Sequence, residues 1–211
     1  MASLIDDVAD MFITKGFSSR KRKEDRSDRL PPGQYVTSGF PILQKGLTPV
    51  IDPDVWSIKV FGMVASKRFT LEDLQNLPST SWVKDIHCVT KWSKFDSAWK
   101  GVLFDEFLTQ LELDGQPQYV MAHSADDYTT NIPLDDLIDG KALIAYEYDN
   151  EPISDSHGGP VRLVVPHLYF WKSAKWLNGL EFIPDDKPGF WEERGYHNYG
   201  DPWLEQRYEG D

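Results

Sequence analysis

The sequence contains a single cysteine, Cys88, among its 211 residues. One cysteine cannot form an internal disulfide, so the fold does not depend on an oxidising compartment. A zinc site made only of protein side chains needs three or four ligands, and one cysteine with five dispersed histidines offers no such spacing. A single thiolate at Cys88 is therefore more consistent with a metal whose other ligands come from a cofactor.

Excess positive charge and long apolar runs are also missing. The formal net charge is -12, which argues against non-specific nucleic-acid binding, because that needs a basic surface. The first 17 residues contain acidic side chains and no long apolar stretch, so they predict neither a secretory signal nor a membrane span. We therefore expect a cytoplasmic protein with no membrane span and no nucleic-acid partner.

Apolar and aromatic residues are present in amounts that can form a sizeable core, at 40% and 13% of the chain. The segment from Lys15 to Arg29 carries seven Lys or Arg against three Asp or Glu, and a Pro-Pro-Gly turn follows it. We predict that residues 1–32 are a charged N-terminal arm, either a solvated segment or a docking arm. Residues 33–211 then form one domain.

Local patterns predict short helices between mostly non-local strands, which is typical of an α+β domain. Thr70 is a plausible helix N-cap, and the apolar spacing of 103–113 predicts a second helix. Alternating or β-branched runs predict strands at 55–64, 81–89, 142–149 and 161–166.

Cys88 lies at the end of the strand predicted at 81–89 and has polar and cationic neighbours. A lone cysteine is often only a small buried hydrophobe, but such neighbours lower the pKa of a thiol. Two functional roles stay open, nucleophile and soft-metal ligand. A nucleophile needs a base within reach, and His87, being adjacent on a strand, would point to the opposite face.

A second group of polar residues lies in the stretch "HGGPVRLVVPHLYFWKSAKW". It places His157, Arg162, Lys172, Ser173 and Lys175 around a Gly-Gly turn and a buried strand. Arginine and lysine bind phosphate groups, and glycine lets backbone approach a ligand closely. In a protein of net negative charge this predicts an anion pocket, although the same residues could be surface charges beside a core strand.

Two further segments are ambiguous. The stretch "HSADDYTTNIP" is either an ordinary polar loop or part of a site, and it contains Tyr128. The aromatic C-terminal stretch either covers a substrate channel or wraps the core; its candidates are Trp191, Tyr196, His197, Tyr199 and Trp203.

Taken together, "DIHCVTKWS", "DDYTTNIPL" and "HGGPVRLVVPHLYFWKSAKWLNGLEF" resemble the molybdopterin-binding domain of the sulfite oxidase family. The family includes a bacterial branch related to the catalytic subunit of methionine sulfoxide reductase. The resemblance runs from about Leu30 to the C-terminus. It implies a mixed-sheet α+β molybdopterin-binding domain of the sulfite oxidase type.

By this resemblance Cys88 supplies the one protein ligand to molybdenum, and the other ligands are dithiolene sulfurs and oxo groups. Tyr128 corresponds to a tyrosine near the oxo face of the metal, and His87 is expected among the cofactor-binding residues. These two assignments and the metal ligand follow from the resemblance alone.

The same resemblance implies that His157 and Arg162 contact the cofactor. Lys172, Ser173 and Lys175 are expected to hold the phosphate of the pterin. The cofactors are thus molybdenum and molybdopterin.

The chain departs from the sulfite oxidase pattern at the substrate. The early loop "VTSGFPILQKG" has no arginine to receive an oxyanion, although Lys45 is close, and Lys91 and Lys94 are candidates for a second cation. The expected substrate is a small oxo-anion or a sulfoxide. Without a "CxxCH" haem motif, electrons must pass to a separate partner.

Three hypotheses result. The first is a molybdenum oxidoreductase that performs two-electron oxygen-atom transfer. The second is a molybdopterin-binding or storage protein without turnover. It would be excluded if the wild type turned over a substrate and Cys88→Ser did not. The third is a thiol hydrolase with Cys88 as nucleophile, which predicts activity without molybdenum.

Overall fold

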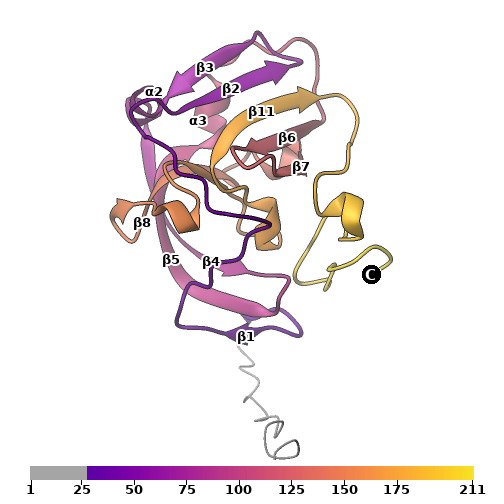
Figure 1. Cartoon of the computed structure of the whole chain (residues 1–211). Coiled ribbons are helices and arrows are strands. Elements are labelled where there is room, and N and C mark those ends of the chain that lie inside the picture. The colour runs from indigo at the N-terminus through magenta and orange to yellow at the C-terminus, as the bar shows by residue number, and fades with distance from the viewer. Residues whose placement is uncertain (1–27) are drawn as a thin grey trace, which may run out of the picture.

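The computed structural model describes residues 28–211, and its backbone is organised as two mixed β-sheets with a few short helices (Figure 1). The first sheet contains β1 (Tyr35–Val36), β4 (Ser79–His87), β5 (Trp92–Leu103), β8 (Leu143–Tyr148), β9 (Glu151–Pro152) and β10 (Arg162–Val164). The second contains β2 (Ser57–Gly62), β3 (Lys67–Thr70), β6 (Tyr119–Ser124), β7 (Thr129–Pro133) and β11 (Leu177–Ile183).

The first sheet is built around β5, which pairs with β1 in parallel and with β4 and β8 antiparallel. Strands β4 and β5 form a hairpin whose turn begins at Cys88, since the Lys91 amide donates to the Cys88 carbonyl oxygen at 3.0 Å. Antiparallel pairing allows this short connection, so the cysteine is fixed at the end of a long hairpin.

The second sheet has the order β3-β2-β11-β6-β7. Its central strand β11 runs parallel to β2 and antiparallel to β6. After β11 the chain leaves the sheet and runs along the right-hand side of the molecule in Figure 1 as an irregular C-terminal segment.

The helices are short: α2 (Leu71–Gln75), α3 (Phe104–Leu108) and four 3-10 turns, η1 (Leu134–Asp136), η2 (Asp155–His157), η3 (Phe170–Lys172) and η4 (Glu192–Arg194). Thr70 caps α2 in a capping box with Asp73, as the sequence pattern predicts. The second predicted helix extends only from Phe104 to Leu108 rather than over 103–113. Within residues 28–211 no helix is long and apolar enough to cross a membrane.

The main apolar core takes side chains from both sheets, among them Ile58 and Val60 of β2 and Ile144 of β8. A second buried cluster surrounds Cys88 and contains Trp92, Trp99 and Phe170. The aromatic residues therefore pack where the hairpin turn meets η3, and this places the thiol in a largely apolar environment.

The structure confirms the predicted α+β class with mixed sheets. The predicted arm lies mostly outside the described residues. Its last part is described: Arg29 pairs with Asp85 at 2.5 Å and with Asp96 at 2.7 Å. Near residue 29, then, the chain is attached to the β4–β5 hairpin.

Candidate functional site

A cavity of about 310 Å³ opens beside Cys88. Its walls come from residues between 40 and 45, 88 and 92, 124 and 128, 162 and 176, and 191 and 196. Of the site residues predicted from the sequence, the cavity brings together Cys88, Tyr128, Arg162, Ser173 and Lys175. Segments that are distant in sequence thus converge on the single thiol.

Cys88 is buried, with 7% of its surface exposed, and burial raises the pKa of its thiol. The Thr90 hydroxyl donates a hydrogen bond to Cys88 Sγ at 3.2 Å and acts in the opposite direction, because it stabilises the thiolate. The Gln34 amide donates to the Cys88 carbonyl oxygen at 3.0 Å. The backbone of Cys88 is therefore held by Gln34, and the residue lines the cavity.

Arg162 is almost fully buried, at 1% exposure, and all its hydrogen bonds go to backbone carbonyls. Its Nη1 donates to His157 O at 2.7 Å and its Nη2 to Ser173 O at 2.8 Å. No carboxylate among residues 28–211 forms an ion pair with it. Burial lowers the pKa of Arg162 to about 9. A buried charge requires a counter-charge, and this cation has none within the described residues.

Lys175 is the second cation of the cavity. Its ammonium donates to Ser156 O at 2.8 Å, and burial, with a contribution from the positive charge of Arg162, lowers its pKa to about 8. Ser173 lies between the two cations in sequence, and its Oγ accepts from the Val165 amide at 2.9 Å, which leaves its own hydroxyl proton available. This end of the cavity is positively charged and suited to an anion.

Tyr128 lines the cavity and donates its hydroxyl proton to Trp171 O at 2.6 Å. Burial raises its pKa well above the ordinary value, so the phenol stays neutral. Its oxygen retains lone pairs that can accept a hydrogen bond from a ligand.

The two predicted histidines do not line the cavity. His87 bonds through its Nδ1 to Ser93 Oγ at 2.8 Å and packs edge-on against Trp203, and burial lowers its pKa to about 4. His157 stacks on Phe40, with ring centroids 4.1 Å apart, and its Nε2 bonds to Phe40 O at 3.2 Å. His157 thus acts on the cavity through Phe40, which does line it.

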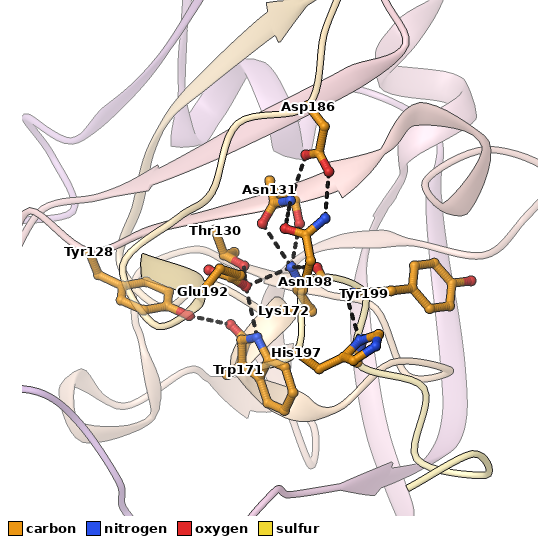
Figure 2. A network of polar contacts seen from close by, with 11 residues as sticks. Tyr128, Thr130, Asn131, Trp171, Lys172, Asp186, Glu192, His197, Asn198 and Tyr199 are labelled. Atoms are coloured by element: carbon orange, nitrogen blue, oxygen red, sulfur yellow. Dashed lines mark hydrogen bonds and ion pairs between the residues drawn. The ribbon is translucent and has the colours of Figure 1, made fainter. Parts of the chain in front are cut away.

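Lys172 is also absent from the cavity wall. Its side chain is fully buried, and its ammonium lies 2.6 Å from Glu192 Oε1, 2.8 Å from Asn131 O, 2.9 Å from Asn131 Oδ1 and 2.7 Å from Asn198 O (Figure 2). An ammonium has three donor hydrogens. With four oxygens around it, Lys172 has no donor left for a phosphate, so the geometry does not support its predicted role there.

Several lining residues were not identified as candidates from the sequence. The indole nitrogen of Trp92 and the hydroxyl of Ser124 are buried and have no hydrogen-bond partner within the described part of the chain. Trp92 lies inside the segment that resembles the family, but nothing in its spacing marks its nitrogen as free. Lys45, which the sequence places in the early loop, also lines the cavity and lies opposite Asp126, with 4.0 Å between charged atoms.

The cavity has a soft thiol at one place and, at another, two cations without an ion-pair partner among the described residues. Such an arrangement suits a ligand that carries both a soft metal and an anionic group. The unpartnered polar atoms of Trp92 and Ser124 fit a ligand that also carries polar ring atoms, such as a pterin. Residues 28–211 contain no group of three or more His, Cys, Asp or Glu that could hold a metal alone. The donor set therefore fits molybdenum held jointly by Cys88 and a pterin dithiolene.

Comparison with known families gives an independent result. Residues 45–191 match the model of the oxidoreductase molybdopterin binding domain. This range contains Cys88, Tyr128, Arg162, Ser173 and Lys175, all of which line the cavity. It spans more than half of the chain.

Curated relatives agree with the family match. The chain is 42% identical over 197 residues to an uncharacterized oxidoreductase, YuiH, of Bacillus subtilis, covering 92% of this chain and all of that protein. It is 26% identical to the protein-methionine-sulfoxide reductase catalytic subunit MsrP of Ralstonia nicotianae, covering 70% of this chain and 50% of that protein. The chain thus spans only half the length of MsrP.

A solved structure shares the fold. The sulfane dehydrogenase SoxCD of Paracoccus pantotrophus superposes with a TM-score of 0.60 at 19% identity, over 65% of this chain and 40% of that chain. The cavity, the donor set and the family match lead to one conclusion. The chain belongs to the oxidoreductase molybdopterin-binding family, which includes the sulfite oxidases, and it is a molybdopterin-dependent oxidoreductase.

Proposed function

We propose that this protein catalyses two-electron oxygen-atom transfer on a small oxo substrate, with Cys88 as the protein ligand to molybdenum. The observation that supports this most directly is the shared cavity, in which the Cys88 thiol, Arg162 and Lys175 surround one space. When bound, the molybdenum cofactor supplies the oxygen-atom and electron chemistry. The chain binds and orients the cofactor and the substrate.

Cys88 is held for this role by its place at the start of the β4–β5 turn. Cys88 would bind the metal as its thiolate, so its thiol proton would be lost on binding. The Thr90 hydroxyl then donates to a sulfur that carries negative charge. Such a bond to a ligand sulfur tunes the donor strength of that sulfur.

Arg162, Lys175 and Ser173 bind the phosphate of the pterin in this proposal. A phosphate would supply the counter-charge that the buried Arg162 lacks and would add to the contribution of Asp126 at the half-buried Lys175, so the lowered pKa values of the two cations support the assignment. We do not retain Lys172 in this group, because its donors are already used. His157 positions Phe40, and His87 is bonded to Ser93 outside the cavity lining.

The substrate is proposed to enter beside Tyr128 and Lys45. The Tyr128 hydroxyl donates to Trp171 O in this structure, so it would have to exchange that bond for one to an oxygen of the substrate. Lys45 belongs to the early loop where a substrate cation is expected, it lines the cavity, and it is partly balanced by Asp126. Relatives named for sulfite and for methionine sulfoxide support a small oxo-anion or sulfoxide substrate.

Electrons are proposed to pass to or from a separate partner protein. The cytoplasmic location expected from the sequence stays a prediction.

The test compares wild-type protein with Cys88→Ser after expression in a host that makes molybdopterin. Molybdenum is measured by plasma mass spectrometry and the pterin by fluorescence after oxidation. We expect near-stoichiometric molybdenum in the wild type, loss of metal in Cys88→Ser, and turnover of sulfite or a sulfoxide only in the wild type. Pterin and metal at wild-type levels in Cys88→Ser would refute the ligand assignment, and loaded protein without any turnover would favour a storage role.

A further inference from the structure

Lys172 is the most deeply buried cation that the proposed function leaves unused. It and Glu192 have side-chain exposures of 0% and 2%, and their charged atoms are 2.6 Å apart. A buried ion pair is costly to desolvate, and removing one partner leaves an uncompensated buried charge. A pair in this position therefore fixes the segments that carry the two charges.

The oxygens around Lys172 come from two different parts of the chain (Figure 2). Asn131 belongs to β7 in the second sheet, whereas Glu192 and Asn198 belong to the C-terminal segment. Asn131 also donates to Asn198 Oδ1 at 3.0 Å and to Asp186 Oδ1 at 2.7 Å. The network thus joins residues 186, 192 and 198 to one strand.

Glu192 makes further bonds inside the same network. Its Oε1 accepts from Thr130 Oγ1 at 3.2 Å and from the Trp171 indole nitrogen at 2.9 Å. Both donors are neutral. Lys172 is consequently the only positive charge among the described residues that forms an ion pair with the Glu192 carboxylate.

Between these attachment points lie the two aromatic residues that the C-terminal segment contributes to the cavity wall, Trp191 and Tyr196. The Tyr196 ring lies 5.2 Å from the Trp171 ring and 5.0 Å from the Trp191 ring, measured between centroids. The segment from 186 to 198 therefore forms a wall of the Cys88 cavity and is attached on both sides of that wall.

We propose that Lys172 is a positioning residue that attaches the wall formed by residues 186–198 to the second sheet and so sets the shape of the Cys88 cavity. The lysine acts through Glu192 and Asn198 and does not touch the ligand. The attachment of the wall does not depend on the cofactor; only its effect on cofactor retention rests on the proposed function.

The first experiment measures amide hydrogen exchange by mass spectrometry in purified full-length protein. In Lys172→Met, Glu192 keeps its charge without a cation, so peptides covering 186–198 should exchange at least tenfold faster. Peptides covering β2 and β3 should stay within twofold of wild type. In Lys172→Met/Glu192→Gln the unpaired carboxylate is removed as well, so the remaining effect is the loss of the bonds that Lys172 makes to residues 131, 192 and 198. Peptides covering 186–198 should then still exchange at least threefold faster than in the wild type.

Lys84→Met serves as the matched control, because Lys84 is an exposed lysine on β4. It should leave every peptide unchanged. Unchanged exchange of 186–198 in Lys172→Met would overturn the proposal, and so would an equal increase in all peptides. If Lys172→Met does not fold, the double variant carries the test: faster exchange confined to 186–198 supports the proposal, and wild-type exchange there overturns it.

The second measurement separates positioning from general stability. Phe107→Ala removes a buried core side chain that does not line the cavity, and it provides a variant of lowered stability. After dialysis of the loaded proteins, Lys172→Met should retain at least tenfold less pterin than Phe107→Ala. Equal retention would overturn the positioning role. If the wall exchanged faster in Lys172→Met but the wild type never contained molybdenum, the proposed function would be refuted and the positioning role of Lys172 would stand.

Discussion

Replacing Arg162 by methionine should release the pterin cofactor. The guanidinium has five N–H groups, and the structure shows one bond each from Nε, Nη1 and Nη2 to backbone carbonyls. One hydrogen on Nη1 and one on Nη2 therefore have no acceptor in the described part of the chain. Because Arg162 lines the cavity, these two donors are available to a phosphate.

The size of the effect follows from those two donors. A hydrogen bond that involves a charged group contributes about 1.5–3 kcal/mol, so two of them contribute about 3–6 kcal/mol. Every 1.4 kcal/mol is a factor of about ten in affinity, which gives a loss of roughly a hundred- to ten-thousand-fold. Arg162→Lys keeps a charge but loses the fork, so its loss should be smaller.

The assay loads each variant in a host that makes molybdopterin and measures pterin and molybdenum before and after dialysis. Arg68→Met is the control, because Arg68 is exposed on β3 and bonds only to Ser57 Oγ among the described residues. Thermal unfolding of the cofactor-free variants separates loss of binding from loss of fold. If folded Arg162→Met retained pterin like the control, Arg162 would not bind the phosphate.

Two further predictions concern pH and packing. Burial lowers the pKa of Lys175 to about 8 from 10.5, so between these values the unfolded state binds more protons and stability rises with pH. The free energy of unfolding is measured with urea in cofactor-free wild type and in Lys175→Met. Over this pH window it should rise in the wild type relative to the variant, by at most about 1.4 kcal/mol per pH unit. If the two proteins showed the same pH dependence, the Lys175 ammonium would not be desolvated and unpaired. Gly101→Ala should destabilise the fold by about 1–3 kcal/mol or more, because a Cβ there would lie 2.1 Å from Ile144 O. Gly46→Ala is the control, because a Cβ at Gly46 would have open space around it. If the two variants unfolded at the same urea midpoint, β5 and β8 would be able to move apart without cost.

Elements with a strong local pattern could be predicted from the sequence. The alternating run around Ser57–Gly62 forms β2, and Thr70 caps α2 through its own hydroxyl. These elements depend on neighbours within a few residues, so the information is local. The position of Cys88 directly after a strand was predictable for the same reason.

Strands β5 and β11 were not predicted, although each is central to its sheet. Strand β11 contains Asn178 and Gly179, residue types that strands disfavour, and it is stabilised by pairing with β2 and β6 from far away in the sequence. Strand β5 carries many polar residues and is fixed by β4, β1 and β8. Non-local pairing overrides local propensity in both cases.

The sequence by itself determined the chemistry available to this protein: one thiol, a group of cations after a Gly-Gly turn, and a resemblance to one family. Only the tertiary structure decided which of these groups share a cavity. Lys172 and Lys175 are the same residue type three positions apart, yet Lys175 faces the cavity and Lys172 is enclosed by oxygens of β7 and the C-terminal segment. The difference arises because the 3-10 turn η3 ends at Lys172 and turns the chain between them, and a local pattern of charges does not encode that direction.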